Sequence, residues 1–278
     1  MLSQPVVNMT RLFTFGCSFT NYHWPTWADI LEPGYDEYHN WARPGAGNQF
    51  IFERLVEADI TFGFTPDDTI IVMWSSHNRH DWYDWFGWQT KGNVLDNPEF
   101  FDKAYLDRFY DIKASIMHSF NYIHAAQQLL ENKHSNWKMT SMDELVKPVV
   151  SEEYMIPKLI KKLTSNEFST FKEWPELLKY ESILTGSNWL SMPLKKYMDN
   201  TKYKYTKKQG DTWDFHPTPI IHYNWLVDQG FEVTDEGKDL AVRWENEFVD
   251  AEVDIEASIA WLANNGIPHL SNHNKHCI

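Results

Sequence analysis

The sequence is poor in cysteine, in basic charge and in long apolar runs. Its 278 residues contain two cysteines, Cys17 and Cys277, near opposite ends, so no disulfide framework is expected. Acidic side chains outnumber basic ones by 39 to 25, and the formal net charge of −14 disfavours binding to nucleic-acid phosphates or to an anionic membrane surface. No apolar run approaches the ~20 residues of a membrane span, and Met1–Asn8 does not resemble a signal peptide. These absences predict a soluble, cytoplasmic protein with no nucleic-acid or membrane partner, although export by another route stays open.

Nucleotide and metal signatures are also scarce. The pair Gly45-x-Gly47 does not extend to a dinucleotide fingerprint, and no Walker-type Gly-Lys-Ser/Thr occurs. Soft metal ligands gather only in the tail, as His269, His273, His276 and Cys277. Because this segment is terminal and polar, we interpret 266–278 as a mobile, solvated tail and expect neither a metal nor a cofactor.

Aromatic residues, in contrast, are abundant. They make up 16% of the chain, and 14 of them are tryptophans, which stack on sugar rings and fill protein cores equally well. The stretch 77–89 is especially rich in them and is predicted to be a loop. Its tryptophans, Trp82, Trp85 and Trp88, are our candidates for substrate binding.

The order of apolar segments predicts an α/β fold. Strands are expected at 12–15, 38–42, 69–74 and, weakly, 137–142, with helices between them that include a long one over 101–131. The continuously apolar run 69–74 is typical of a strand buried on both faces of a parallel sheet. We predict one domain over 1–278, a three-layer, flavodoxin-like doubly wound parallel sheet. The lysine-rich segment 145–210 is predicted to be an inserted helical lid or subdomain.

The stretch 11–20 places a serine at the end of the first strand. Gly16 ends the apolar run and Ser18 follows two residues later. A serine on such a turn is well presented as a nucleophile, near backbone N–H groups that can hold an oxyanion. A buried strand followed by a helix-capping serine explains the same pattern, and Cys17 is an alternative, thiol nucleophile.

A serine nucleophile needs a base, and the best candidate lies far downstream. In Asp214-Phe215-His216-Pro217 the histidine is followed by a stiffening proline, and the aspartate lies two residues before it. In an extended segment such residues point the same way, so Asp214 is placed to orient His216. The other reading is an ordinary turn before a helix. His222, six residues after His216, is expected to cap or pack that helix.

In combination these blocks resemble the SGNH/GDSL hydrolase family over about residues 10–250. The blocks are Gly-Cys-Ser-Phe-Thr, Asn40-x4-Gly45, a polar loop after the third strand, and Asp-x-His-Pro. The resemblance implies that Ser18 is the nucleophile and that its backbone N–H is an oxyanion donor. It implies a second donor at the N–H of Gly45, with Gly47 as the alternative, and His216 as the base.

Three positions depart from the family pattern. Cys17 replaces the usual aspartate before the serine. The final aspartate normally lies three residues before the histidine, where this chain has Trp213; Asp214 is one residue late, and Asp211 is a more distant alternative. The third block lacks Gly-x-Asn-Asp, so the third oxyanion donor falls on Asn78 with a one-residue shift or on His77 without one. We favour Asn78, because a neutral amide needs no protonation to donate.

The sequence therefore predicts a serine-dependent ester hydrolase that needs no metal. The tryptophans favour an O-acetylated carbohydrate, or another short-chain ester, as substrate. The alternative is a non-catalytic glycan-binding or particle-associated structural protein that keeps the esterase-like fold. The irregular third and last blocks are what such a protein would show.

Overall fold

A four-stranded parallel sheet lies at the centre of the computed structural model, which describes residues 9–143, 145, 175–200, 207–209, 212–248 and 253–267. Its order is β2-β1-β3-β6. The strands are β2 (Glu37–Asn40), β1 (Arg11–Phe15), β3 (Thr69–Trp74) and β6 (Asn136–Ser141). β1 and β3 are flanked on both edges and buried almost throughout, which explains their continuous apolar runs. This is the strand order of a flavodoxin-like doubly wound sheet, and the predicted α/β fold class is confirmed.

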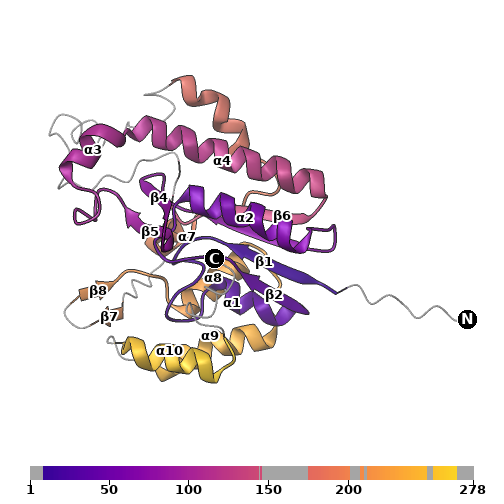
Figure 1. The fold of residues 1–278 in the computed structure, drawn as a ribbon. Coiled ribbons are helices and arrows are strands. Elements are labelled where there is room, and N and C mark those ends of the chain that lie inside the picture. The colour runs from indigo at the N-terminus through magenta and orange to yellow at the C-terminus, as the bar shows by residue number, and fades with distance from the viewer. Residues whose placement is uncertain are drawn as a thin grey trace, which may run out of the picture.

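Helices cover both faces of the sheet, giving three layers (Figure 1). On one face α2 packs against α4, and α4 packs against the 3-10 segment η2; on the other face α1 packs against α8 and α9. The helical elements are α1 (Trp27–Leu31), η1 (Glu32–Gly34), α2 (Asn48–Phe62), α3 (Lys103–Phe109), α4 (Ile112–Lys133), η2 (Pro175–Leu184), α7 (Leu194–Asn200), α8 (Pro219–Asp228), α9 (Asp235–Glu247) and α10 (Ile255–Asn264). Because all four strands of the sheet are parallel, their carboxyl ends meet at one edge.

The stretch 77–89 was predicted to be a loop, and this prediction is wrong. The stretch contains most of a β-hairpin. Strand β4 (Arg79–Asp84) pairs with the antiparallel strand β5 (Gly87–Asn93). At the turn, the Asp84 carboxylate accepts the N–H of Phe86 at 2.8 Å, and Gly87 has a φ of 93°. The aromatic run thus serves strand pairing, and Figure 1 places this hairpin near the carboxyl-end edge of the sheet.

The single helix predicted over 101–131 is wrong as well. The structure has α3 and α4 there, separated at Tyr110 and Asp111. Asp111 is the N-cap of α4, and its side chain accepts the N–H of Ala114 at 2.7 Å. A side-chain cap of this kind starts a new helix rather than continuing an old one.

Part of the segment 145–210 lies outside the described residues, and its described part joins the domain core. Met139 of β6 donates its N–H to the carbonyl of Asn188 at 2.8 Å and accepts the N–H of Leu190 at 2.9 Å. This parallel bridge continues the sheet beyond β6. Residues 175–200 therefore extend the main fold, while the lid proposed for the remainder of the segment stays a prediction.

A second hairpin leads the chain back to the sheet edge. Strands β7 (Lys207–Gln209) and β8 (Thr212–Asp214) pair antiparallel, and α8 starts shortly after β8. The predicted tail is described only at Gly266 and Ile267; residues 268–278 lie outside the described part. In the described ranges no helix has the length and apolar character needed to cross a bilayer.

Candidate active site

Ser18 lies in a tight turn directly after β1. The N–H groups of Thr20 and Asn21 donate to the carbonyl of Cys17 at 2.9 and 3.1 Å, which folds the chain back over two residues. Gly16 makes this turn possible, because a Cβ there would lie 2.1 Å from Oγ1 of Thr20. The sequence Gly-x-Ser thus produces a serine held at the carboxyl end of a central strand.

Cys17 points in another direction. Its side chain is fully buried, and its Sγ lies 3.5 Å from Sδ of Met142. A thiol enclosed in the core in this way cannot reach a substrate, which removes the basis for Cys17 as the alternative nucleophile.

Three predicted residues form one chain of hydrogen bonds. Ser18 Oγ lies 2.7 Å from His216 Nε2, and His216 Nδ1 lies 2.6 Å from Asp214 Oδ1. The same oxygen of Asp214 accepts the backbone N–H of His216 at 2.8 Å. This local turn lets an aspartate two residues before the histidine reach the ring. Asp211, the alternative acid, lies outside the described residues.

Tyr22 completes this arrangement and was not predicted from the sequence. Its hydroxyl donates to Asp214 Oδ2, the oxygen that does not contact His216. Its ring stacks on the His216 ring with 3.9 Å between centroids and 20° between planes. The ring of Phe19 is tilted against the same His216 ring, with 5.3 Å between centroids. One tyrosine therefore holds both the acid and the base. Its only sequence signal is that it follows Ser18 by four residues.

The electrostatics keep the Asp214 carboxylate ionised. Burial raises the pKa of Asp214, but its hydrogen bonds to His216 and Tyr22 and the charge of His216 outweigh burial, and the net pKa is lowered. His222 is buried in α8; burial and the charge of His216 lower its pKa to about 3, so it stays neutral. This agrees with a packing role for His222.

The loop after β2 brings Gly45 toward the same edge. Asn40 ties this loop to the Ser18 turn, donating from Nδ2 to the carbonyl of Thr20 at 3.0 Å. Among the described residues, none accepts a hydrogen bond from the backbone N–H of Ser18 or of Gly45. The N–H of Gly47 is in contrast held by Asp81 at 2.9 Å, so of the two glycines Gly45 has the available donor.

The two candidates for a third oxyanion donor have different surroundings. Asn78 is fully buried, and its Oδ1 accepts from the Tyr110 hydroxyl at 2.6 Å, so its Nδ2 end is turned away from Tyr110. His77 is also buried, and burial lowers its pKa to about 4, which leaves a neutral imidazole. The role of Asn78 as a donor stays a prediction.

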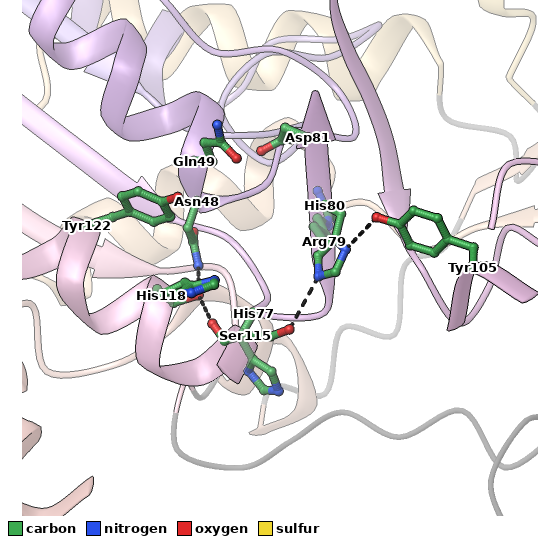
Figure 2. Close-up of a pocket in the computed structure, with 11 residues that line it drawn as sticks. Asn48, Gln49, His77, Arg79, His80, Asp81, Tyr105, Ser115, His118 and Tyr122 are labelled. Atoms are coloured by element: carbon green, nitrogen blue, oxygen red, sulfur yellow. Dashed lines mark hydrogen bonds between the residues drawn. The ribbon is translucent and has the colours of Figure 1, made fainter. Parts of the chain in front are cut away.

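His77 lines a separate polar cavity of about 180 Å³ between α2, α4 and the β4–β5 hairpin (Figure 2). His80, on one wall, contacts the hydroxyls of Tyr105 at 2.9 Å and Ser115 at 3.3 Å. Neither Ser18 nor His216 is among the lining residues. The ungapped alternative for the third donor therefore belongs to the lining of this cavity.

The structure does not bring the three candidate tryptophans together. Trp88 is a core residue 5% exposed, packed against Phe50 with ring centroids 5.5 Å apart. Trp88 lies opposite Tyr83 on the neighbouring strand, and Trp82 precedes Tyr83 by one residue. Because successive side chains of a strand point to opposite faces, Trp82 lies on the other face of the hairpin. Trp85 is fully exposed at the turn. Only Trp85 is therefore open to a ligand over its whole side chain.

No metal centre is found in the described part of the chain, where no three or more His, Cys, Asp or Glu side chains are grouped so as to hold an ion. The histidines of the tail lie outside that part.

The sequence matches no protein-family model and no curated protein. Among solved structures it is similar to the YXIM protein of Bacillus subtilis, with 15% identity and a TM-score of 0.41, over 83% of this chain and 59% of that one. A member of the lipolytic G-D-S-L family from Veillonella parvula has 12% identity and a TM-score of 0.41, over 79% of this chain and 97% of that one. A GDSL-like lipase from Bacteroides thetaiotaomicron has 16% identity and a TM-score of 0.34, over 90% of this chain and 93% of that one. The chain is thus distantly similar to solved proteins that include GDSL lipolytic ones.

Proposed function

We propose that the chain is a serine ester hydrolase of the SGNH/GDSL type. The observation that carries this proposal is the continuous hydrogen-bonded chain from Ser18 Oγ through His216 to Asp214, with distances of 2.7 and 2.6 Å. A nucleophile in contact with a base, and a base in contact with an orienting acid, is the arrangement that activates a hydroxyl for acyl transfer. It favours an enzyme over a non-catalytic binding protein, for which this alignment has no purpose.

The reaction follows from the proton positions. The Asp214 carboxylate accepts a hydrogen bond from the Nδ1–H of His216, so the neutral ring has its lone pair at Nε2, facing the hydroxyl of Ser18. Ser18 Oγ attacks the ester carbonyl carbon while its proton moves to Nε2. The charge on the former carbonyl oxygen is held by the N–H groups of Ser18 and Gly45, joined by Asn78 as the third donor.

The second half returns the enzyme to its starting state. The Nε2 proton of His216 passes to the leaving alcohol as the C–O bond breaks, which leaves an acyl group on Ser18. Water then attacks this acyl group while His216 Nε2 takes its proton; the bond between the acyl carbon and Ser18 Oγ breaks, the proton passes from Nε2 to Oγ, and the acid is released. The steps balance with the chain's own residues and water alone.

For the substrate we propose a short-chain ester, with an O-acetylated carbohydrate preferred. The exposed ring of Trp85, on the same hairpin as the exposed Tyr83, supports this preference because indole faces stack on sugar rings. Esters of other alcohols share the same chemistry at the carbonyl.

Hydrolysis of an aryl acetate tests the proposal. We expect turnover by the wild type, a fall in kcat of at least about 10³-fold in Ser18→Ala and in His216→Ala, and little change in Cys17→Ala. Cys17→Ala is a matched control because it alters the neighbouring, core-facing side chain. Absence of turnover by the wild type on every short ester, or activity that survives Ser18→Ala but disappears in Cys17→Ala, would contradict the proposal.

A further inference from the structure

The loop 43–47, which contains Gly45, has no regular secondary structure of its own. Each of its five residues is instead hydrogen-bonded to the β4–β5 hairpin. The bonds are Arg43 Nη1 to Trp88 O (2.8 Å), Thr90 Oγ1 to Pro44 O (2.9 Å), Gly92 N to Gly45 O (3.0 Å), Arg79 Nη1 to Ala46 O (3.1 Å) and Gly47 N to Asp81 Oδ1 (2.9 Å). A fixed strand pair therefore holds every position of an irregular loop.

The loop 43–47 and the β4–β5 hairpin also lie too close together to leave room for a side chain between them. Gly45 has a φ of +77°, and a Cβ there would lie 2.4 Å from the carbonyl oxygen of Thr90. At Gly47 a Cβ would lie 2.7 Å from Oδ2 of Asp81. The loop is thus held by shape as well as by hydrogen bonds.

Asp81 joins this loop to the helix that follows. Its carboxylate accepts the N–H of Gly47 through both oxygens, at 2.9 and 3.1 Å, and that of Phe50 at 3.0 Å. Gly47 is the N-cap of α2 but has no side chain with which to cap it. Asp81, from another element, satisfies these orphan N–H groups, and its negative charge suits a helix N-terminus.

We propose that the β4–β5 hairpin fixes the N–H of Gly45 in the oxyanion hole, and that Asp81 is its principal positioning residue. The hairpin bonds the carbonyl of Gly45 and both neighbouring residues but leaves the N–H of Gly45 without an acceptor among the described residues. A donor that must meet a charge only in the transition state has to be held in place beforehand. The proposal rests on the proposed ester hydrolase, since it assigns the hairpin a task at the same site.

Substitution of Asp81 tests the inference by steady-state kinetics on the aryl acetate. A donor displaced by about 1 Å costs ~10²-fold, and one lost altogether costs ~10²–10³-fold in kcat. We therefore expect kcat to fall about 10- to 100-fold in Asp81→Ala and less in Asp81→Asn, whose amide oxygen still accepts one N–H. KM should change less than about threefold, because the oxyanion forms only after binding.

Two further variants separate positioning from folding. Asp84→Asn changes a carboxylate at the turn of the same hairpin and should leave kcat unchanged. Thr90→Val keeps the side-chain shape and removes only the bond to Pro44, so kcat should fall a few-fold with Tm nearly unchanged. Amide exchange at Gly47 and Phe50 should quicken in Asp81→Asn but not in Asp84→Asn.

The outcomes also distinguish this inference from the proposed function. An active wild type in which Asp81→Ala and Thr90→Val keep full kcat would overturn the role of the hairpin and leave the hydrolase standing. A fall in kcat matched by an equal fall in Asp84→Asn would also overturn it. A wild type inactive on every ester would overturn both.

Discussion

At the scale of single residues, Asp214 reaches the ring of His216 through a short local turn. Asp214 was expected to point alongside His216 because the two are two residues apart in an extended segment. In the structure Asp214 Oδ1 also accepts the backbone N–H of His216, which turns the chain and fixes the short spacing. Tyr22 was missed because nothing in its local pattern differs from an ordinary core aromatic. Contacts between segments 192 positions apart, such as Tyr22 and Asp214, arise only from the fold.

Tyr22→Phe should separate the two contacts of this side chain. The phenylalanine keeps the ring on His216 but loses the hydroxyl bond to the Asp214 carboxylate, and a hydrogen bond to a charged group has a net value of about 1.5–3 kcal/mol. We expect kcat/KM on the aryl acetate to fall roughly 10- to 150-fold. Tyr22→Leu, which also loses the stacked ring, should cost more. Tyr180→Phe is the control, since it removes a hydroxyl that donates to Asn121 of α4, outside the site. Wild-type kcat/KM in Tyr22→Phe would show that the hydroxyl does not hold the acid.

Among the elements, the parallel strands were predicted accurately and the hairpin was not. Strands such as β3 are buried on both faces, so nearly every side chain along them is apolar, and the sequence shows this as an apolar run. The β4–β5 segment mixes aromatic, charged and amide side chains, because one face packs on the core while the turn is exposed. Gly87, with its φ of 93°, was the available turn signal. Likewise Asp111, a residue type that favours N-caps, was the signal that α3 and α4 are separate.

Gly45→Ala should reveal how tightly the hairpin encloses the loop 43–47. The alanine must keep a φ of +77° and approach the carbonyl oxygen of Thr90, so we expect a cost of roughly 2–4 kcal/mol in the free energy of unfolding. Gly230→Ala is the control, because Gly230 has a φ of +81° with open space around its added Cβ. Its cost in the free energy of unfolding should be roughly 1–2 kcal/mol. Urea unfolding measures both, and equal costs would mean that the hairpin leaves room at Gly45.

At the scale of the whole molecule, carboxyl groups and histidines shifted by burial have opposite effects on how the stability of the folded state depends on pH. Burial raises the pKa of Asp29 to about 6 and that of Glu32, which also faces the charge of Asp29, to about 7. Burial lowers the pKa of His77 to about 4 and that of His222 to about 3. The carboxyl groups favour the folded state more strongly as pH falls, while the histidines favour it less. The stability of the wild type should therefore change little between pH 4 and 6.5, and single variants are needed to expose each part.

Asp29→Asn should expose the carboxyl part. The pKa of Asp29 lies above its unfolded value of 3.8, so the folded wild type binds the extra proton between about pH 4 and 6, and its stability decreases as pH rises through that window. Asparagine has no such charge to bury, while its amide oxygen can still accept from the N–H of Thr26. Between pH 4 and 7 the free energy of unfolding of the variant should increase relative to that of the wild type by at most about 3 kcal/mol. Urea unfolding at both pH values measures this difference.

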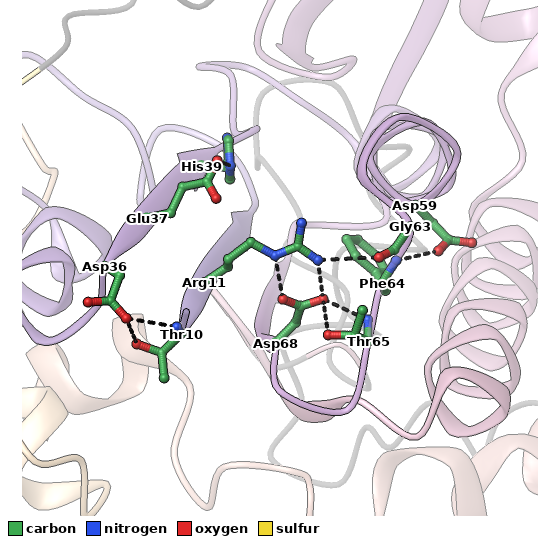
Figure 3. A network of polar contacts seen from close by, with 10 residues as sticks. All are labelled: Thr10, Arg11, Asp36, Glu37, His39, Asp59, Gly63, Phe64, Thr65 and Asp68. Atoms are coloured by element: carbon green, nitrogen blue, oxygen red, sulfur yellow. Dashed lines mark hydrogen bonds and ion pairs between the residues drawn. The ribbon is translucent and has the colours of Figure 1, made fainter. Parts of the chain in front are cut away.

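Asp36→Asn is the control of opposite sign. Asp36 is exposed at the amino-end edge of the sheet, where it accepts the N–H and the hydroxyl of Thr10 at 2.8 and 2.9 Å (Figure 3). These bonds lower its pKa, so its contribution is present above about pH 4 and is lost as pH falls below that value. Asp36→Asn should therefore lose stability relative to the wild type as pH rises through this lower range. The two variants should therefore change in stability in opposite directions as pH rises. A change in the same direction would show that burial is not the source of the pH dependence of Asp29, since burial is what raises its pKa where hydrogen bonds lower that of Asp36.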